Sequence, residues 1–126
     1  MLREHDAAAL AELGLPYEAA AEPGFVNVVI ADYPTGPGLE PERTSVLMRL
    51  PLGFPDATPD MFWCDPPVVI AAGATVPGTE VRETHVGRTW QRWSRHVQGQ
   101  WRPGIDNLGT YLAYIRRCFD VAGGRA

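Results

Sequence analysis

Residues 90–104, WQRWSRHVQGQWRPG, combine side chains that could carry out acyl transfer. A serine hydroxyl is a weak nucleophile and needs a neighbouring base to take its proton as it attacks. His96 follows Ser94 by two residues. In an extended segment such residues share a face about 6.6 Å apart, whereas in a helix they diverge. His85, nine residues before Ser94, is a second candidate base. These residues indicate a candidate catalytic site at Ser94.

The same residues have simpler explanations, which the sequence leaves open. Ser-x-His triplets arise by chance, and a serine beside arginine can be a solvated surface group. Arg88, Arg92 and Arg95 either orient an acidic partner through paired hydrogen bonds or are solvated as well. Trp93, which precedes Ser94, is expected to contact that partner. The other tryptophans are expected in the core: Trp63, Trp90 and Trp101.

The two cysteines do not suggest a metal or disulfide site. Cys64 and Cys118 lie far apart in the sequence, with no CxxC pair. Both are expected to be small buried hydrophobic residues. We therefore expect neither a metal nor any other cofactor.

Composition indicates one globular domain, residues 1–126, with 45% hydrophobic and 21% charged residues. No run approaches the ~18 apolar residues of a membrane span. The acidic N-terminus does not resemble a secretory signal. We expect a cytoplasmic protein that does not act at a membrane.

The charge is unevenly distributed. All eleven basic residues are arginine, because of GC-rich coding or because a protein that handles amine-directed acylation avoids modifying itself. The net charge is −4, but residues 82–102 carry +4, so the remainder carries −8. A basic strip on an acidic chain argues against nucleic-acid binding and favours an acidic protein partner.

Local patterns predict the elements that must position these residues. A helix over 5–13, with Asp6 as a plausible cap, ends at Gly-Leu-Pro. Strands over 25–33 and 43–51 form an antiparallel hairpin with a long loop. Residues 52–70 contain a proline-rich connection and a short aromatic strand, and residues 71–89 are expected to be irregular.

A second helix follows Asp106 or Asn107, either of which can cap it. Arg116 and Arg117 are expected in its last turn, and Gly123-Gly124 ends it. Its apolar residues recur at steps of three and four: Leu108, Tyr111, Leu112, Ile115 and Phe119. The result is an α+β fold with three or four antiparallel strands covered on one face.

Two motifs resemble the ubiquitin-conjugating enzyme superfamily. FPDATPDMF resembles the proline-rich motif that closes its β-meander, and WRP resembles the motif that opens the helix behind its active site. Gly87, WQRWSRH and WRPG are similar to the signature of a bacterial branch, prokaryotic conjugating-enzyme family E, over about residues 25–120. The resemblance implies that fold without its last two helices. The superfamily's catalytic cysteine is missing, and Trp93 and Ser94 occupy its place.

The resemblance implies a carrier that accepts the C-terminal acyl group of a bacterial ubiquitin-like protein from an adenylating activating enzyme. Ser94 would hold the acyl group as an oxyester and pass it to a target, with His85 as base or as oxyanion donor in place of the family's asparagine. Expected partners also include a deconjugating peptidase from the same operon, in an antiphage defence system. The alternative is an inactive variant that binds a ubiquitin-like protein or acts as a scaffold.

Overall fold

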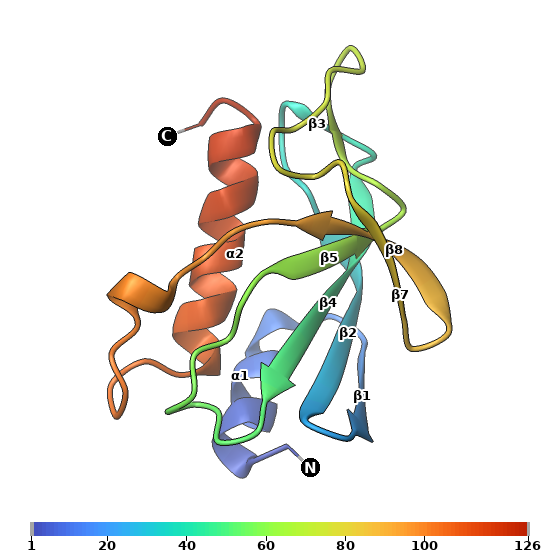
Figure 1. Cartoon of the computed structure of the whole chain (residues 1–126). Coiled ribbons are helices and arrows are strands. Elements are labelled where there is room, and N and C mark those ends of the chain that lie inside the picture. Colours follow the sequence, from blue (N-terminus) through green and yellow to red (C-terminus); the bar gives the residue numbers. More distant parts are fainter. Residues whose placement is uncertain (1, 126) are drawn as a thin grey trace.

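The computed structural model describes residues 2–125, apart from the side chain of Gln98. Two helices, α1 (Glu4–Leu13) and α2 (Leu108–Ala122), pack against one face of a six-stranded antiparallel sheet with the order β1-β2-β4-β5-β8-β7 (Figure 1). The predicted α+β class is therefore confirmed. The strands of this sheet are β1 (Tyr17–Glu22), β2 (Phe25–Pro34), β4 (Arg43–Pro51), β5 (Phe62–Asp65), β7 (Arg82–His85) and β8 (Arg88–Trp93). A separate pair consists of β3 (Leu39–Glu40) and β6 (Val69–Ile70).

The first helix agrees with the prediction except at its start. Asp6 does not cap α1: Arg3 precedes the helix, and no side chain accepts a hydrogen bond there. Asp6 is instead buried and lies 3.0 Å from the Arg3 guanidinium. Gly14 ends the helix with a φ of 69°, a conformation that glycine adopts without steric penalty.

The predicted hairpin of β2 and β4 is confirmed, with Val28 opposite Met48 in the register. The sheet contains more strands than predicted, because β1 and the β7–β8 hairpin were not expected. The sequence of β1, YEAAAE, is rich in alanine and glutamate, which are depleted in strands, and it forms by pairing with the edge of β2.

The expectation that residues 71–89 are irregular is wrong over their last part. Residues 82–93 form the β7–β8 hairpin, and β8 also pairs with β5. Its turn places Val86 at a φ of 46° and Gly87 at 74°, the backbone of a tight hairpin turn. A β-branched residue rarely adopts a positive φ, so the valine at position 86 gives no sequence signal that predicts this turn.

Side chains alternate between the two faces of the sheet. The face covered by the helices contributes Val28, Ile30, Phe62 and Trp93 to the main core, together with Leu10 of α1. The outer face, which neither helix covers, holds a smaller cluster of Leu47, Trp63 and Trp90 (Figure 1). This alternation decides on which face each candidate site residue lies.

The second helix begins after Asn107, which settles the choice between Asp106 and Asn107. The Asn107 side chain accepts a hydrogen bond from the Thr110 amide, and the Thr110 hydroxyl accepts one from the Asn107 amide. The last turn holds no basic residue, so the placement of Arg116 and Arg117 there is wrong: the helix continues to Ala122. It is the last element among residues 2–125.

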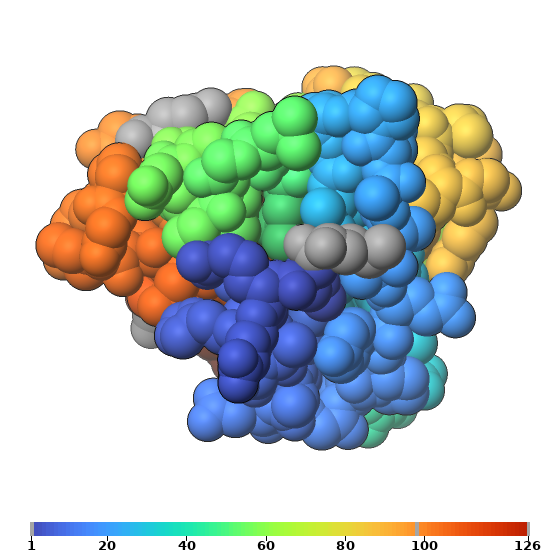
Figure 2. All heavy atoms as spheres, turned by 90° about the horizontal axis from the view of Figure 1, so that it is seen from below, coloured from blue at the N-terminus to red at the C-terminus, as the bar shows by residue number. Residues whose placement is uncertain are grey.

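The proline-rich connection, residues 52–61, lies beside α1 and residues 101–107 on the face shown in Figure 2. The Trp101 indole is 8% exposed and donates a 2.8 Å hydrogen bond to the Pro55 carbonyl. The Tyr111 hydroxyl of α2 donates to the Met61 carbonyl. These contacts attach the connection to the segment that leads into α2.

Candidate active site

Ser94 directly follows β8, and here the chain runs between the segment that contains Gly78 and the segment that contains Met61. The Ser94 amide donates to the Gly78 carbonyl at 2.9 Å, and the Met61 amide donates to the Arg95 carbonyl at 3.0 Å. These bonds on both sides extend the sheet pairing beyond Trp93. The Arg95 guanidinium lies 5.0 Å from the centre of the Trp93 ring, so these two side chains share one face. Because side chains alternate along an extended segment, Ser94 and His96 are expected on the other face.

His96 contacts a residue that sequence reasoning missed. Its Nδ1 lies 2.6 Å from Oδ1 of Asp60, on the connection that precedes β5. The His96 side chain is 54% exposed and that of Asp60 is 39% exposed. Ser94 is half-buried, and its hydroxyl makes no hydrogen bond to another described group of residues 2–125. The structure thus brings Asp60 and His96 into contact next to Ser94.

His85 does not lie beside Ser94, contrary to expectation. It pairs with Arg88 at the turn end of the β7–β8 hairpin. Arg88 lies six positions before Ser94, which at ~3.3 Å per residue is about 20 Å of extended chain. His85 therefore belongs to another group of residues on the outer face.

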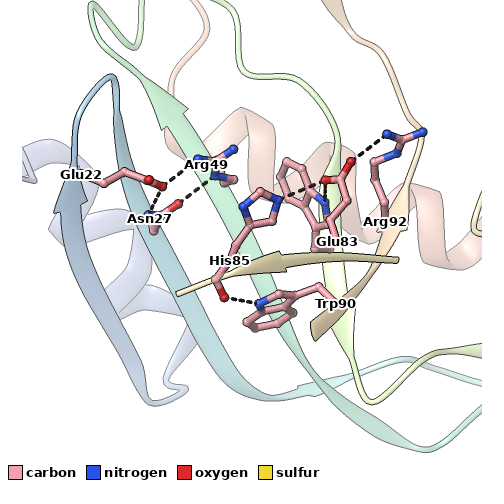
Figure 3. A network of polar contacts seen from close by, with 8 residues as sticks. Glu22, Asn27, Arg49, Glu83, His85, Trp90 and Arg92 are labelled. Atoms are coloured by element: carbon pink, nitrogen blue, oxygen red, sulfur yellow. Dashed lines mark hydrogen bonds and ion pairs between the residues drawn. The ribbon is translucent and has the colours of Figure 1, made fainter. Parts of the chain in front are cut away.

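The group around His85 centres on Glu83 (Figure 3). Nε2 of His85 lies 3.0 Å from Oε1 of Glu83, which also accepts a hydrogen bond from the Trp63 indole at 2.9 Å. Arg92 donates to the other carboxylate oxygen. Burial raises the pKa of Glu83, but hydrogen bonds from His85, Trp63 and Arg92 outweigh it and leave that pKa lowered. Glu83 is therefore a fixed charge that connects three neighbours.

A second polar group lies next to it on the outer face (Figure 3). The Asn27 amide donates to Glu22 at 2.6 Å, and Arg49 donates to both residues. Arg49 also borders a hollow of about 550 Å³ that it shares with Trp63, His85 and Asp60, among others.

The predicted partner-binding residues are dispersed. Arg88 donates to Asp65 and lies over Trp90, near the hairpin turn, whereas Arg92 is paired with Glu83. Arg95 alone of the three adjoins Ser94, donating to its carbonyl oxygen at 3.1 Å. Trp93 has no exposed surface, so the expectation that it contacts a partner is wrong.

The remaining tryptophans are buried as predicted. Trp63 is 3% exposed, Trp90 0% and Trp101 8%. Trp93 packs among core rings, with its centroid 5.3 Å from that of Phe62 and 4.9 Å from that of Phe119. The tryptophans near Ser94 in the sequence therefore serve to pack the hydrophobic core, and the half-buried Ser94 lies at the edge of that core.

Neither cysteine occupies the position of Ser94. Cys64 is fully buried in β5, and this burial raises the pKa of its thiol well above the ordinary value. Cys118 of α2 is half-buried, so the expectation that it is buried is wrong, and it lines a hollow of about 540 Å³ with Arg95 and Tyr114. Burial also raises the pKa of Cys118, although Arg95 opposes the shift. Both thiols are protonated near neutral pH and are poor nucleophiles.

Two further features of residues 2–125 bear on function. No three histidine, cysteine, aspartate or glutamate side chains in this part of the chain are grouped to hold a metal ion. Neither of its helices has the length and apolar character needed to cross a membrane.

Comparison with known proteins gives a match to one family model over nearly the whole chain. No curated protein and no solved structure matches it. One family model, described as prokaryotic E2 family E, matches residues 2–122, which run from α1 to the last residue of α2. This is the conjugating-enzyme-like family whose signature Gly87, WQRWSRH and WRPG resemble. The chain belongs to prokaryotic E2 family E.

Proposed function

We propose that the protein is a conjugating enzyme that carries the C-terminal acyl group of a ubiquitin-like protein as an oxyester on Ser94. The family supports a conjugating-enzyme-like role. The observation that carries the serine assignment is the position of Ser94: it is half-buried directly after β8, two residues before His96. Its segment then leads to Trp101 and α2, as in the superfamily's active-site segment.

In the loading step, Ser94 Oγ attacks the activated carboxyl carbon of the ubiquitin-like protein. A carbon–oxygen bond forms as the bond to the activating enzyme's thiolate breaks. The hydroxyl proton passes to His96 and from there to the leaving sulfur, so that atoms and charge balance. Attack of a target amine or hydroxyl on the ester reverses the roles and frees Ser94.

Of the three predicted partner-binding arginines, Arg95 is the one that adjoins Ser94, but its side chain is on the face opposite to the one expected for Ser94 and His96, so it would hold the tail upstream of the reacting carboxyl carbon. It follows Ser94 in the chain and borders the hollow of about 540 Å³ whose other walls include Tyr114 and Val121 of α2. A guanidinium beside an apolar surface suits a peptide tail, since it donates to carbonyl or carboxylate oxygens while the surface holds aliphatic side chains. Arg88 and Arg92 are paired elsewhere and have no such part in the proposal.

The test is reconstitution with an activating enzyme and ubiquitin-like protein from the same operon, followed by intact mass measurement. The wild-type adduct should survive reducing agent, which releases thioesters by exchange, and decompose in hydroxylamine. Ser94→Ala should abolish the adduct and change the free energy of unfolding by less than about 0.5 kcal/mol. Ser94→Cys should yield an adduct that reducing agent removes.

Ser45 provides a matched control, because it is the only other serine in the chain and is also half-buried. Ser45→Ala should load like wild type. An adduct that persists in Ser94→Ala would refute the serine assignment.

The second candidate function is binding without catalysis. The absence of a cysteine next to Ser94 favours it, because Trp93 at that position is buried and Cys64 is buried in β5. A wild-type protein that binds the ubiquitin-like protein in titration calorimetry, yet forms no adduct with an active activating enzyme, would establish this function instead.

A further inference from the structure

Asp60 and His96 meet in an arrangement that activates serine nucleophiles. The carboxylate contacts Nδ1 of His96 at 2.6 Å, which leaves Nε2 as the ring nitrogen without that partner. A carboxylate at Nδ1 keeps the imidazole proton there, so Nε2 can accept a proton from a hydroxyl. Ser94 lies two residues earlier in an extended segment, where side chains at such positions share one face about 6.6 Å apart, and it is the hydroxyl nearest to that ring along the chain.

The chain holds Asp60 in place through its neighbours. Pro59 before it is buried, and Met61 after it has a φ of 62°. The Met61 amide donates to the Arg95 carbonyl, and the Met61 carbonyl accepts from Tyr111. The carboxylate is thus attached to a backbone that is bonded on one side to the Ser94–His96 segment and on the other to α2.

We infer that Ser94, His96 and Asp60 form a nucleophile–base–carboxylate triad that accepts acyl groups from small activated esters without any protein partner, an inference that rests on the proposed function because Ser94 is the nucleophile in both. The substrate class is an ester with a good leaving group, such as a nitrophenyl acetate. Asp60 is a positioning residue, since it acts through His96.

The reaction balances within these groups. Ser94 Oγ forms a bond to the acetyl carbon while the carbon–oxygen bond to nitrophenolate breaks, and the leaving oxygen keeps the electron pair. The hydroxyl proton moves to Nε2 of His96 and is then released. Water, activated by the same nitrogen, later hydrolyses the acetyl-serine and restores the free hydroxyl.

The test is acetylation of the isolated full chain by 4-nitrophenyl acetate, followed by peptide mapping by mass spectrometry. The chain contains no lysine, so side-chain amine acetylation does not obscure the product. Ser94 should be the main acetylated residue, and Ser94→Ala should lose that label. His96→Ala should lower the rate about 100-fold, within the range typical of a general base. Ser45→Ala should react like wild type.

Asp60 needs readouts that a merely structural role would not change. Asp60→Ala should lower the acetylation rate about tenfold or more, and added formate should restore part of it by replacing the carboxylate. Nitrogen-15 NMR of His96 should show the neutral ring protonated at Nδ1 in wild type and at Nε2 in Asp60→Ala. Asp56→Asn, an exposed carboxylate on the same connection, is the matched control and should leave both readouts unchanged.

The outcomes separate this triad from the conjugation proposal. Ser94 that loads the ubiquitin-like protein but resists the ester, or acetylation that Asp60→Ala leaves unchanged, would overturn the triad alone. Acetylation of Ser94 that requires Asp60, without any adduct to the ubiquitin-like protein, would uphold the triad and refute the conjugation proposal.

Discussion

Cys64 is a thiol that is too deeply buried to act as a nucleophile. It lies in β5 opposite Gln91 of β8, with no exposed surface and a raised pKa due to burial. A group in that environment cannot reach an acyl donor as a thiolate. At the scale of single residues, burial therefore removes Cys64 as a nucleophile, whereas the proposed nucleophile Ser94 is only half-buried.

We predict that neither cysteine is needed for transfer. The Cys64→Ala, Cys118→Ala double variant should load the ubiquitin-like protein at the wild-type rate. It should lose about 1–2 kcal/mol of unfolding free energy, because a small void replaces the Cys64 sulfur. Urea unfolding and intact mass measure the two effects. If a folded Cys64→Ala protein could not load, the assignment to Ser94 would be wrong.

At the scale of elements, α2 begins with a reciprocal cap. The Asn107 side chain and the Thr110 hydroxyl each accept a backbone amide, which satisfies two donors that have no partner within the helix. This cap fixes where α2 starts, and so the register with which Tyr111 meets the Met61 carbonyl. The start of the helix and the connection next to the candidate site are therefore coupled.

We predict that Asn107→Ala lowers the free energy of unfolding by about 1 kcal/mol, because it removes this cap. Asn107→Asp should retain nearly all of it, since aspartate caps helices equally well. Urea denaturation followed by circular dichroism measures both variants. Equal loss in the two variants would show that the cap does not contribute.

At the scale of the whole molecule, four carboxylates that lie on different parts of the chain have lowered pKa values. Hydrogen bonds from Asn27 and Arg49 lower the pKa of Glu22, and those of Arg102 and Arg125 lower the pKa of Asp106 and Asp120. Glu83 is the fourth. A carboxylate whose pKa is lower in the folded state binds fewer protons there than in the unfolded chain. Its stabilising effect is complete above its ordinary pKa and is lost as the pH falls further.

We predict that stability falls as the pH drops through the ordinary values of 4.5 for the glutamates and 3.8 for the aspartates. Urea midpoints measured from pH 7 down to pH 3, which begin above the ordinary carboxyl pKa values and end below them, test this. Glu83→Gln should flatten the dependence, because it removes a charge that Arg92 and His85 contact. Glu12→Gln, exposed on α1, is the control. A Glu83→Gln profile with the wild-type slope would contradict the prediction.

Local patterns in the sequence were sufficient to predict several elements of the fold and the family. Side chains that recur at steps of three and four predicted α2, and β-branched runs predicted β2 and β4, because a single element determines its own periodicity. The proline and tryptophan motifs predicted the family. The spacing of Ser94 and His96 implied a shared face in an extended segment, which depends only on backbone geometry.

Contacts between distant segments required the tertiary structure. Asp60 lies 36 residues before His96, and no local pattern relates them: the Met61–Arg95 hydrogen bond that follows the β5–β8 pairing brings them together. The same pairing turns Trp93 into the core and places His85 at the far end of its hairpin. The sequence alone determines which residues of a helix or strand share a face. Only the pairing of strands decides what each face meets, because register joins residues that are distant along the chain.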